Sequence, residues 1–144
     1  MKIPGVALLL LLACHFTGNA TPDTTALGGR WYLEPVLPSD TAAGKIPWLD
    51  LNPENSRFTG NSGCNAMHGK FYFSKTDSSF AFNDEIFTAR MACPGYNESA
   101  FLKSLKKTAG FRLNNGTLTL LGEDKTELSR WTRKPAKAPK ALKT

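Results

Sequence analysis

The sequence predicts a mainly β (α+β) fold: a small antiparallel β-barrel or sandwich with one covering helix. Three observations predict it. Short runs of aromatic and β-branched residues with a two-residue apolar period recur along the chain, and clusters of Gly, Asn, Asp and Pro separate them. Only one segment has the apolar spacing of a helix. Because strands precede and follow this helix, we expect an antiparallel sheet that the helix covers at an opening or an edge.

Five strands are expected before the helix. In the first strand Pro35 indicates an edge or a bend, because proline cannot donate a ladder hydrogen bond. In a later strand the apolar Phe71 and Phe73 are two residues apart, which is the spacing of one sheet face. The expected strands are 30–36, 46–51, 57–60, 69–74 and 80–82.

One helix is expected between Asn97 and Gly110. Asn97 is suited to the N-cap, and Glu98 would lie near the positive end of the helix dipole. Gly110 is suited to the C′ position that ends a helix. The apolar stripe that would face the core consists of Phe101, Leu102, Leu105 and Ala109.

The chain returns to β structure after the helix. Asn115 and Gly116 form a turn between two apolar runs, and both residues tolerate the positive φ of a tight hairpin. The strands of this closing meander are expected at 111–113, 117–121 and 126–132.

The N-terminus resembles a bacterial lipoprotein signal peptide. Lys2 precedes an apolar run at 6–12, which is far shorter than the ~20 residues that a membrane-spanning helix needs. The run ends in Leu-Leu-Ala-Cys, the pattern of a lipobox. We therefore expect cleavage of residues 1–13 and acylation, with palmitate among the chains, at Cys14. The alternatives are an ordinary secretory signal with an incidental Cys14, or a short membrane anchor.

The rest of the chain divides into three parts. We expect a flexible tether at 14–28, one folded domain at 29–132 and a disordered Lys/Pro/Ala tail at 133–144. The net charge of +6 comes from Lys2 and from the tail, which contains no acid, so the body is neutral. No specific nucleic-acid partner is expected. The tail is either solvated or in contact with anionic lipopolysaccharide, cell-wall polymers or lipid headgroups.

Cys64 and Cys93 are the two thiols that remain in the domain. In an oxidising envelope compartment, an even pair most simply forms a disulfide. Two alternatives stay open. One is a zinc site that uses Cys64, His68 and Cys93, although zinc usually takes three or four ligands. The other is a Cys64 nucleophile with His68 as its base, which also needs a group to orient the histidine.

Catalytic motifs are missing from the sequence. It contains no phosphate-binding glycine loop, no Gly-x-Ser-x-Gly elbow and no His-Glu-x-x-His. We therefore expect no enzyme, no metal and no cofactor.

Two blocks of sequence resemble the META domain family, the HslJ-like proteins. The segment 59–65, followed by 69–72, resembles the family's Gly-Cys-Asn…Gly-x-Tyr block, and 87–94 resembles its Thr-x-x-Met-Ala-Cys-Pro block. Ala89 departs from the pattern, where a second threonine is common. The resemblance spans about 29–132 and implies a compact β-barrel-like fold with a helix. It also implies that Cys64 and Cys93 are structural residues near each other.

The resemblance implies little biochemistry. Members are linked to stress responses, antibiotic tolerance and parasite virulence without an established reaction, and a looser fold similarity connects them with lipoprotein pilotins. We expect a non-catalytic, monomeric lipoprotein of the bacterial envelope, on the outer membrane facing the periplasm, that serves envelope stress response or tolerance by binding a partner protein or apolar ligand. The alternatives are a pilotin-like chaperone for outer-membrane assembly and a cysteine-dependent enzyme.

Overall fold

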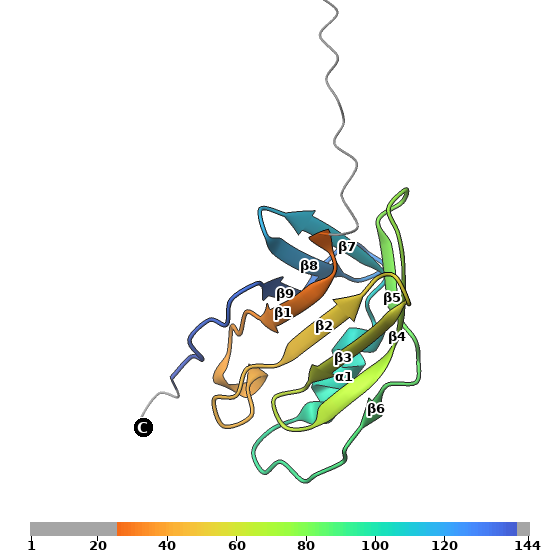
Figure 1. Ribbon diagram of the computed structural model, residues 1–144. Helices are drawn as coiled ribbons and strands as arrows, with labels where there is room; N and C mark the ends of the chain where they lie inside the picture. Colours follow the sequence, from red (N-terminus) through yellow and green to blue (C-terminus); the bar gives the residue numbers. More distant parts are fainter. Residues whose placement is uncertain (1–25, 141–144) are drawn as a thin grey trace, which may run out of the picture.

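Eight antiparallel strands close into a barrel, with a ninth short strand on its outside and one helix covering the core (Figure 1). The computed structural model describes residues 26–140. The elements in chain order are β1 (Gly29–Leu33), the 3₁₀ turn η2 (Pro38–Asp40), β2 (Trp48–Asn52), β3 (Arg57–Asn61), β4 (Ala66–Ser74), β5 (Ser79–Phe82), β6 (Phe87–Thr88), α1 (Glu98–Lys106), β7 (Gly110–Asn114), β8 (Thr117–Leu121) and β9 (Glu127–Thr132).

The sheet closes because its first and last strands in spatial order also pair. That order is β3, β2, β1, β9, β8, β7, β5 and β4, and β4 returns to pair with β3. The strand β6 pairs with the first half of β4, on the edge away from β3, through Met67–Thr88 and His68–Phe87, and β5 pairs with the second half of β4. The predicted mainly β fold with a covering helix is confirmed, and the architecture is a barrel. Closure leaves few exposed strand edges.

Aromatic side chains fill the barrel. Trp31 and Trp131 are fully buried, and the rings of Phe71 and Phe80 stack with centroids 5.2 Å apart. Each large apolar side chain that is removed from water contributes about 1.5–3 kcal/mol. The two-residue spacing predicted these inward positions correctly, since Phe71 is buried and Phe73 packs against the core.

The helix begins where the sequence predicts and ends earlier. The Ala100 N–H donates to the Asn97 side chain at 3.0 Å, which confirms the N-cap. The prediction that Gly110 is the C′ residue is wrong, because Lys107 caps the helix and Gly110 begins β7. A Cβ at Gly110 would lie 3.2 Å from the Ser78 carbonyl oxygen, so the glycine permits close contact between β7 and the turn before β5.

The strand boundaries differ from the predictions by at most three residues, with the largest differences at the end of β1 and the start of β4, and one strand was not predicted. β1 ends at Leu33, before Pro35, because proline has no N–H to continue the ladder. β4 starts three residues earlier than expected, since Gly69 lies within the strand; a Cβ there would be 2.9 Å from the Phe58 ring. β6 was not predicted, because two residues carry no measurable period.

The folded part extends beyond the predicted range 29–132 at both ends. Leu27 is buried, and its carbonyl accepts a hydrogen bond from the Trp31 indole at 2.9 Å. The guanidinium of Arg133 lies 3.5 Å from the centroid of Trp31 and donates to the carbonyl of Ala26 at 2.5 Å and of Arg30 at 3.2 Å. We call this contact the terminal latch. The terminal latch therefore connects the segment after β9 with the segment that leads into β1.

The predicted signal peptide 1–13, the lipidation residue Cys14 and the tether up to residue 25 lie outside the described residues. Within residues 26–140, no helix combines the length and the apolar character needed to cross a membrane.

The terminal latch predicts a specific loss of stability. Arg133→Ala removes a cation–π contact and two charged hydrogen bonds, so we expect the free energy of unfolding to fall by about 2 kcal/mol. Urea denaturation followed by tryptophan fluorescence measures it. Lys134→Ala is the matched control, because Lys134 contributes only its backbone carbonyl, to Thr132. Equal midpoints for the two variants would show that the latch does not stabilise the barrel.

Candidate functional site

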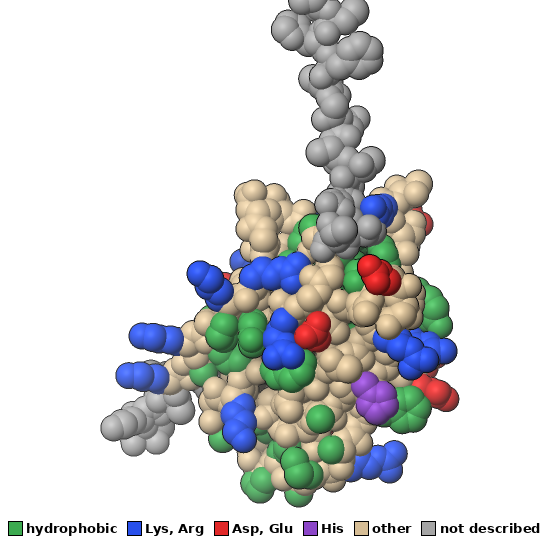
Figure 2. All heavy atoms as spheres, viewed as in Figure 1, with side chains coloured by type: hydrophobic (Ala, Val, Ile, Leu, Met, Phe, Trp, Pro, Cys, Tyr) green, Lys and Arg blue, Asp and Glu red, His purple; other side chains and the backbone are tan. Residues whose placement is uncertain are grey.

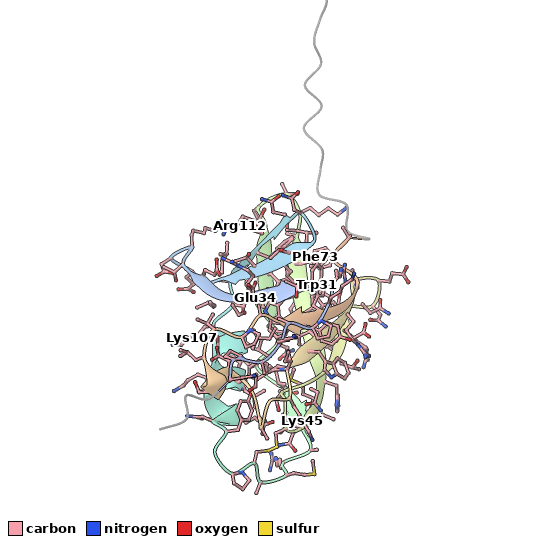
Figure 3. All side chains as sticks on the ribbon, turned by 90° about the vertical axis from the view of Figure 1, so that its left-hand side faces the viewer. Trp31, Glu34, Lys45, Phe73, Lys107 and Arg112 are labelled. Atoms are coloured by element: carbon pink, nitrogen blue, oxygen red, sulfur yellow. A yellow bond between two sulfur atoms is a disulfide. The ribbon has the colours of Figure 1, made fainter. Side chains whose placement is uncertain are left out.

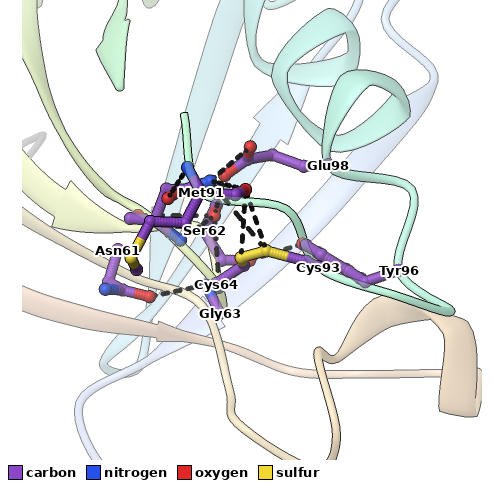
Figure 4. The surroundings of a disulfide bond; sticks show 9 residues. Asn61, Ser62, Gly63, Cys64, Met91, Cys93, Tyr96 and Glu98 are labelled. Carbon is purple, nitrogen blue, oxygen red and sulfur yellow. Dashed lines mark hydrogen bonds between the residues drawn. A yellow bond between two sulfur atoms is a disulfide. The ribbon is translucent and has the colours of Figure 1, made fainter. Parts of the chain in front are cut away.

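The two sequence blocks meet at one end of the barrel. The loop between β3 and β4 carries Cys64, and the segment between β6 and α1 carries Cys93 (Figure 4). The structure joins them in a disulfide with Cα atoms 6.1 Å apart, a separation within the usual disulfide range. This bond attaches the segment that leads into α1 to the barrel.

The side chain of Asn65 uses both of its polar groups beside the disulfide, and it is fully buried. Its amide nitrogen donates to the Met91 carbonyl at 3.0 Å and to Glu98 Oε2 at 2.8 Å, and its oxygen accepts the Met91 N–H at 2.8 Å. A buried amide is stable only when such partners are present. Asn65 therefore holds together the β3–β4 loop, the segment after β6 and the first turn of α1.

Ser62 and Tyr96 complete the same network. The Ser62 hydroxyl donates to Glu98 Oε1, and the Tyr96 hydroxyl donates to the Ser62 carbonyl at 2.5 Å. Burial, together with the negative charge of Glu98, raises the pKa of Tyr96 well above its usual range. Tyr96 therefore remains a protonated donor at neutral pH. We call Ser62, Asn65, Tyr96 and Glu98 the polar clasp.

A cleft of about 620 Å³ opens beside the clasp, between α1 and β9. Figure 3 views this side of the molecule, with Glu34 labelled above the helix. The volume lies within the range of ~300–1,000 Å³ that is common for ligand pockets. The lining residues are Leu33, Glu34, Val36, Ser39, Asp40, Tyr96, Asn97, Ala100, Phe101, Ser104, Leu105, Glu127, Leu128, Ser129, Arg130 and Trp131.

The cleft exists because β1 pairs only with the C-terminal end of β9 and leaves the first residues of β9 without a neighbouring strand on that side. Their ladder finishes at Leu33–Trp131, and one further bond runs from the Glu34 N–H to the Arg130 carbonyl at 2.8 Å. Pro35 then turns the chain away, since it has no N–H to donate. α1 lies beside this gap in the seam, and its Phe101 ring lies 6.3 Å from that of Trp131.

The chemistry of the cleft favours binding of apolar groups. Its floor is formed by buried or half-buried apolar side chains, among them Leu105 and Trp131. Its rim is polar and includes an ion pair of 3.0 Å between Glu127 and Arg130. An apolar floor with a few polar rim groups is typical of sites for small ligands or for one face of a peptide.

The residues of the alternative zinc and nucleophile sites are engaged in other contacts. Cys64 and Cys93 have their sulfur atoms in the disulfide. His68 is exposed on β4, and its ring stacks on Phe87 at 5.2 Å. Within the described part of the chain, no group of three or more His, Cys, Asp or Glu side chains is arranged to hold a metal ion.

Sequence reasoning did not identify the polar clasp. Asn65 and Glu98 are 33 residues apart, and no local periodicity connects them. Ser62 was included only in the segment 59–65 that resembles the family's first block, and Glu98 was interpreted only as a first-turn acid. The usable indication was that Asn65 directly follows a cysteine of one block, while Glu98 follows the cysteine of the other by five residues.

The closed eight-stranded barrel with one covering helix defines the chain as a small antiparallel barrel domain. The chain belongs to the META domain family, whose sequence profile matches residues 24–135. The match includes both cysteine blocks, the clasp and every lining residue of the cleft. None of the curated proteins compared with the chain matches it.

Solved structures share the fold. A DUF4847 family protein from Bacteroides vulgatus ATCC 8482 has a TM-score of 0.55 at 14% identity, with 74% of this chain and 93% of that chain covered. A Burkholderia xenovorans protein solved by NMR has a TM-score of 0.54 at 20% identity, with 93% and 98% covered. Another NMR structure has a TM-score of 0.52 at 24% identity, with 72% and 87% covered. These similarities concern the fold alone.

The clasp predicts a pH-dependent variant. Asn65→Asp places a second carboxylate beside Glu98 and removes two donated hydrogen bonds, so we expect a loss of at least about 2 kcal/mol at pH 7. Burial and Glu98 raise the folded-state pKa of the new carboxyl above its unfolded value. The loss is therefore full above the folded pKa and shrinks as the pH falls toward about 4.

Urea denaturation between pH 4 and pH 7 measures this effect. Asn55→Asp is the matched control, because the exposed Asn55 oxygen accepts the Arg57 N–H and a carboxylate oxygen accepts it equally. A stability deficit for Asn65→Asp that does not change with pH would contradict the assigned contact with Glu98.

The disulfide predicts the mass of the oxidised chain and the stability that is lost when the bond is reduced. Intact mass under non-reducing conditions should be lower than that of the reduced chain by two hydrogens, and alkylation should leave Cys64 and Cys93 unmodified. For cysteines 29 residues apart, the chain-entropy model gives a stabilisation of about 3.5 kcal/mol, which reduction should remove. Complete alkylation of both thiols without reductant would show that the bond does not form.

Proposed function

We propose that this chain is a non-catalytic lipoprotein of the bacterial envelope that holds the apolar part of a partner in the cleft between α1 and β9. Its site of action is the periplasmic face of the outer membrane, where it serves envelope stress response or tolerance. The cleft is the observation that carries the proposal, because it combines a ligand-sized volume with a largely apolar floor.

The construction of the cleft supports a binding role. The disulfide and the polar clasp fix the N-terminal end of α1, which forms one wall of the cleft. A wall that is held before the partner arrives loses little conformational freedom on binding, and this favours affinity. Such a role requires a rigid apolar surface and no catalytic residues.

The state of the sulfur atoms supports a non-catalytic reading. A nucleophilic cysteine must be a thiolate with a base beside it. In the structure the Cys64 sulfur is bonded to that of Cys93, and the ring of His68 stacks on Phe87. The sequence at Cys14 supports export and acylation, because a small residue and an apolar run precede it.

A pilotin-like assembly chaperone is a second candidate. It requires a groove that accepts one face of an amphipathic helix or an acyl chain, and the apolar floor around Phe101, Leu105 and Trp131 favours it. Co-purification of an outer-membrane secretin with the anchored chain distinguishes this candidate from binding of a small apolar ligand.

Site-specific photocrosslinking in intact envelopes tests the proposal. A photoreactive amino acid at Ser104, which lines the cleft, should give a discrete adduct with a protein or lipid. The same group at Thr76, in the exposed turn between β4 and β5, is the matched control and should give none. Ala100→Trp fills the cleft from the exposed face of α1 and should remove the adduct.

The anchor is tested in the same cells. Cys14→Ser, or treatment with globomycin, should leave unprocessed precursor and reduce the Ser104 adduct, because the domain is no longer held beside its partner. Equal adducts from Ser104 and Thr76 would contradict the cleft as the binding site. Unchanged processing with globomycin would contradict lipidation while leaving the cleft result to stand.

A further inference from the structure

The turn after β1 presents two apolar side chains to solvent. Val36 is 81% exposed and Leu37 is 57% exposed, whereas most leucines of the barrel strands are buried. We call Val36 and Leu37 the apolar tip. Isolated exposed apolar residues are common on proteins, so the arrangement of the backbone decides whether this tip has a purpose.

The backbone of the apolar tip is already hydrogen-bonded to the protein. The carboxylate of Asp40 accepts the Val36 N–H at 2.8 Å and the Leu37 N–H at 2.7 Å, and the Leu37 carbonyl accepts the Asp40 N–H at 3.0 Å. Apolar surroundings offer no hydrogen bonds, so backbone groups enter them at low cost only when they are paired internally. The tip is therefore suited to a non-aqueous environment.

A basic segment leaves the barrel on the same side. After β9 the tail follows Arg133, whose contacts in the terminal latch fix where the tail begins. Figure 1 shows the tail and the segment after β1 extending from the same side of the barrel, and in Figure 2 Lys and Arg side chains gather on that side. Its described lysines are all exposed: Lys134, Lys137 and Lys140.

Few acidic side chains oppose this charge. No Asp or Glu follows Glu127 in the chain. Glu127 is paired with Arg130, and Glu34 adds to the negative charge that raises the pKa of Arg130. The carboxylate of Asp40 faces the backbone of the tip. Among the described residues, no carboxylate is paired with Lys134, Lys137 or Lys140, so these lysines can meet an external anion.

We propose that the apolar tip and the lysines of the tail together form a contact with the surface of an anionic lipid bilayer. The tip enters the headgroup region with both of its N–H groups and the Leu37 carbonyl already hydrogen-bonded, and the lysines pair with lipid phosphates. An apolar element beside a basic one is the usual composition of a peripheral membrane contact. A protein partner would supply apolar surface, but the tip alone, two residues wide, is too small for a stable protein interface.

The lysines should control the contact. Each lysine near an anionic surface strengthens binding about fivefold, so replacing three should lower the docked population roughly 100-fold. Because this attraction is electrostatic, high salt should weaken it as well.

Lipid photolabelling tests the proposal on the full chain in its native N-terminal state. The chain is placed in vesicles of phosphatidylcholine and phosphatidylglycerol in which a fixed share of the phosphatidylcholine carries a diazirine on its acyl chain, and mass spectrometry locates the adducts. We expect labelling of the peptide that contains Val36 and Leu37. The peptide that contains Phe87, which is 55% exposed on β6, is the internal control and should be labelled far less.

Two variants complete the test. K134Q/K137Q/K140Q should reduce labelling of the tip roughly 100-fold, and vesicles of phosphatidylcholine alone should do the same. V36S/L37S changes only exposed side chains, so the barrel should fold, and it should abolish labelling at the tip. Equal labelling of the tip and the Phe87 peptide overturns the proposal, and so does labelling that persists in the glutamine variant. An unlabelled tip in anionic vesicles also overturns it.

Discussion

The buried amide of Asn65 is the constraint on which the functional end of the barrel depends. A single side chain is bonded to the Met91 backbone and to Glu98, so three segments that are distant in sequence have one relative position. The disulfide brings the same segments together, but a covalent link alone allows rotation. The directional bonds of the amide remove that freedom, because each donor and acceptor has one partner direction. The position of α1, and thereby one wall of the cleft, follows from this residue.

A second constraint acts at the opposite wall. Pro35 ends the pairing of β1 with β9, and the barrel seam stays open over the first part of β9, at residues 127–129. In most small barrels such an opening would expose the core to water. Here α1 covers it in part, with Leu105 buried and Phe101 half-buried. The cleft is thus a consequence of how a barrel with a proline in its seam strand is closed by a short helix.

Much of the fold could be predicted because it depends on residues that are close together in the sequence. The Asn115-Gly116 turn has positive φ at both residues, and Asn97 caps the helix, so short-range rules identified both. Gly110 was misassigned because a glycine required by close packing looks in sequence like a helix-ending glycine. At the candidate site, the two cysteines could be paired by counting, but the clasp and the cleft could not be found. They arise from contacts such as Asn65–Glu98, which the sequence does not encode by spacing.

The terminal latch has a mechanical consequence. Because Arg133 donates a hydrogen bond to the carbonyl of Ala26, tension applied through the N-terminal segment acts on the end of β9 as well as on β1. The pairing between these two strands is short, because only Tyr32 and Leu33 of β1 take part in it. Without the contact of Arg133, a pull on the start of β1 would break these hydrogen bonds one after another. Coupling the two chain ends distributes the load over both strands. Under such tension, the short pairing between β1 and β9 would not be the first part of the barrel to separate.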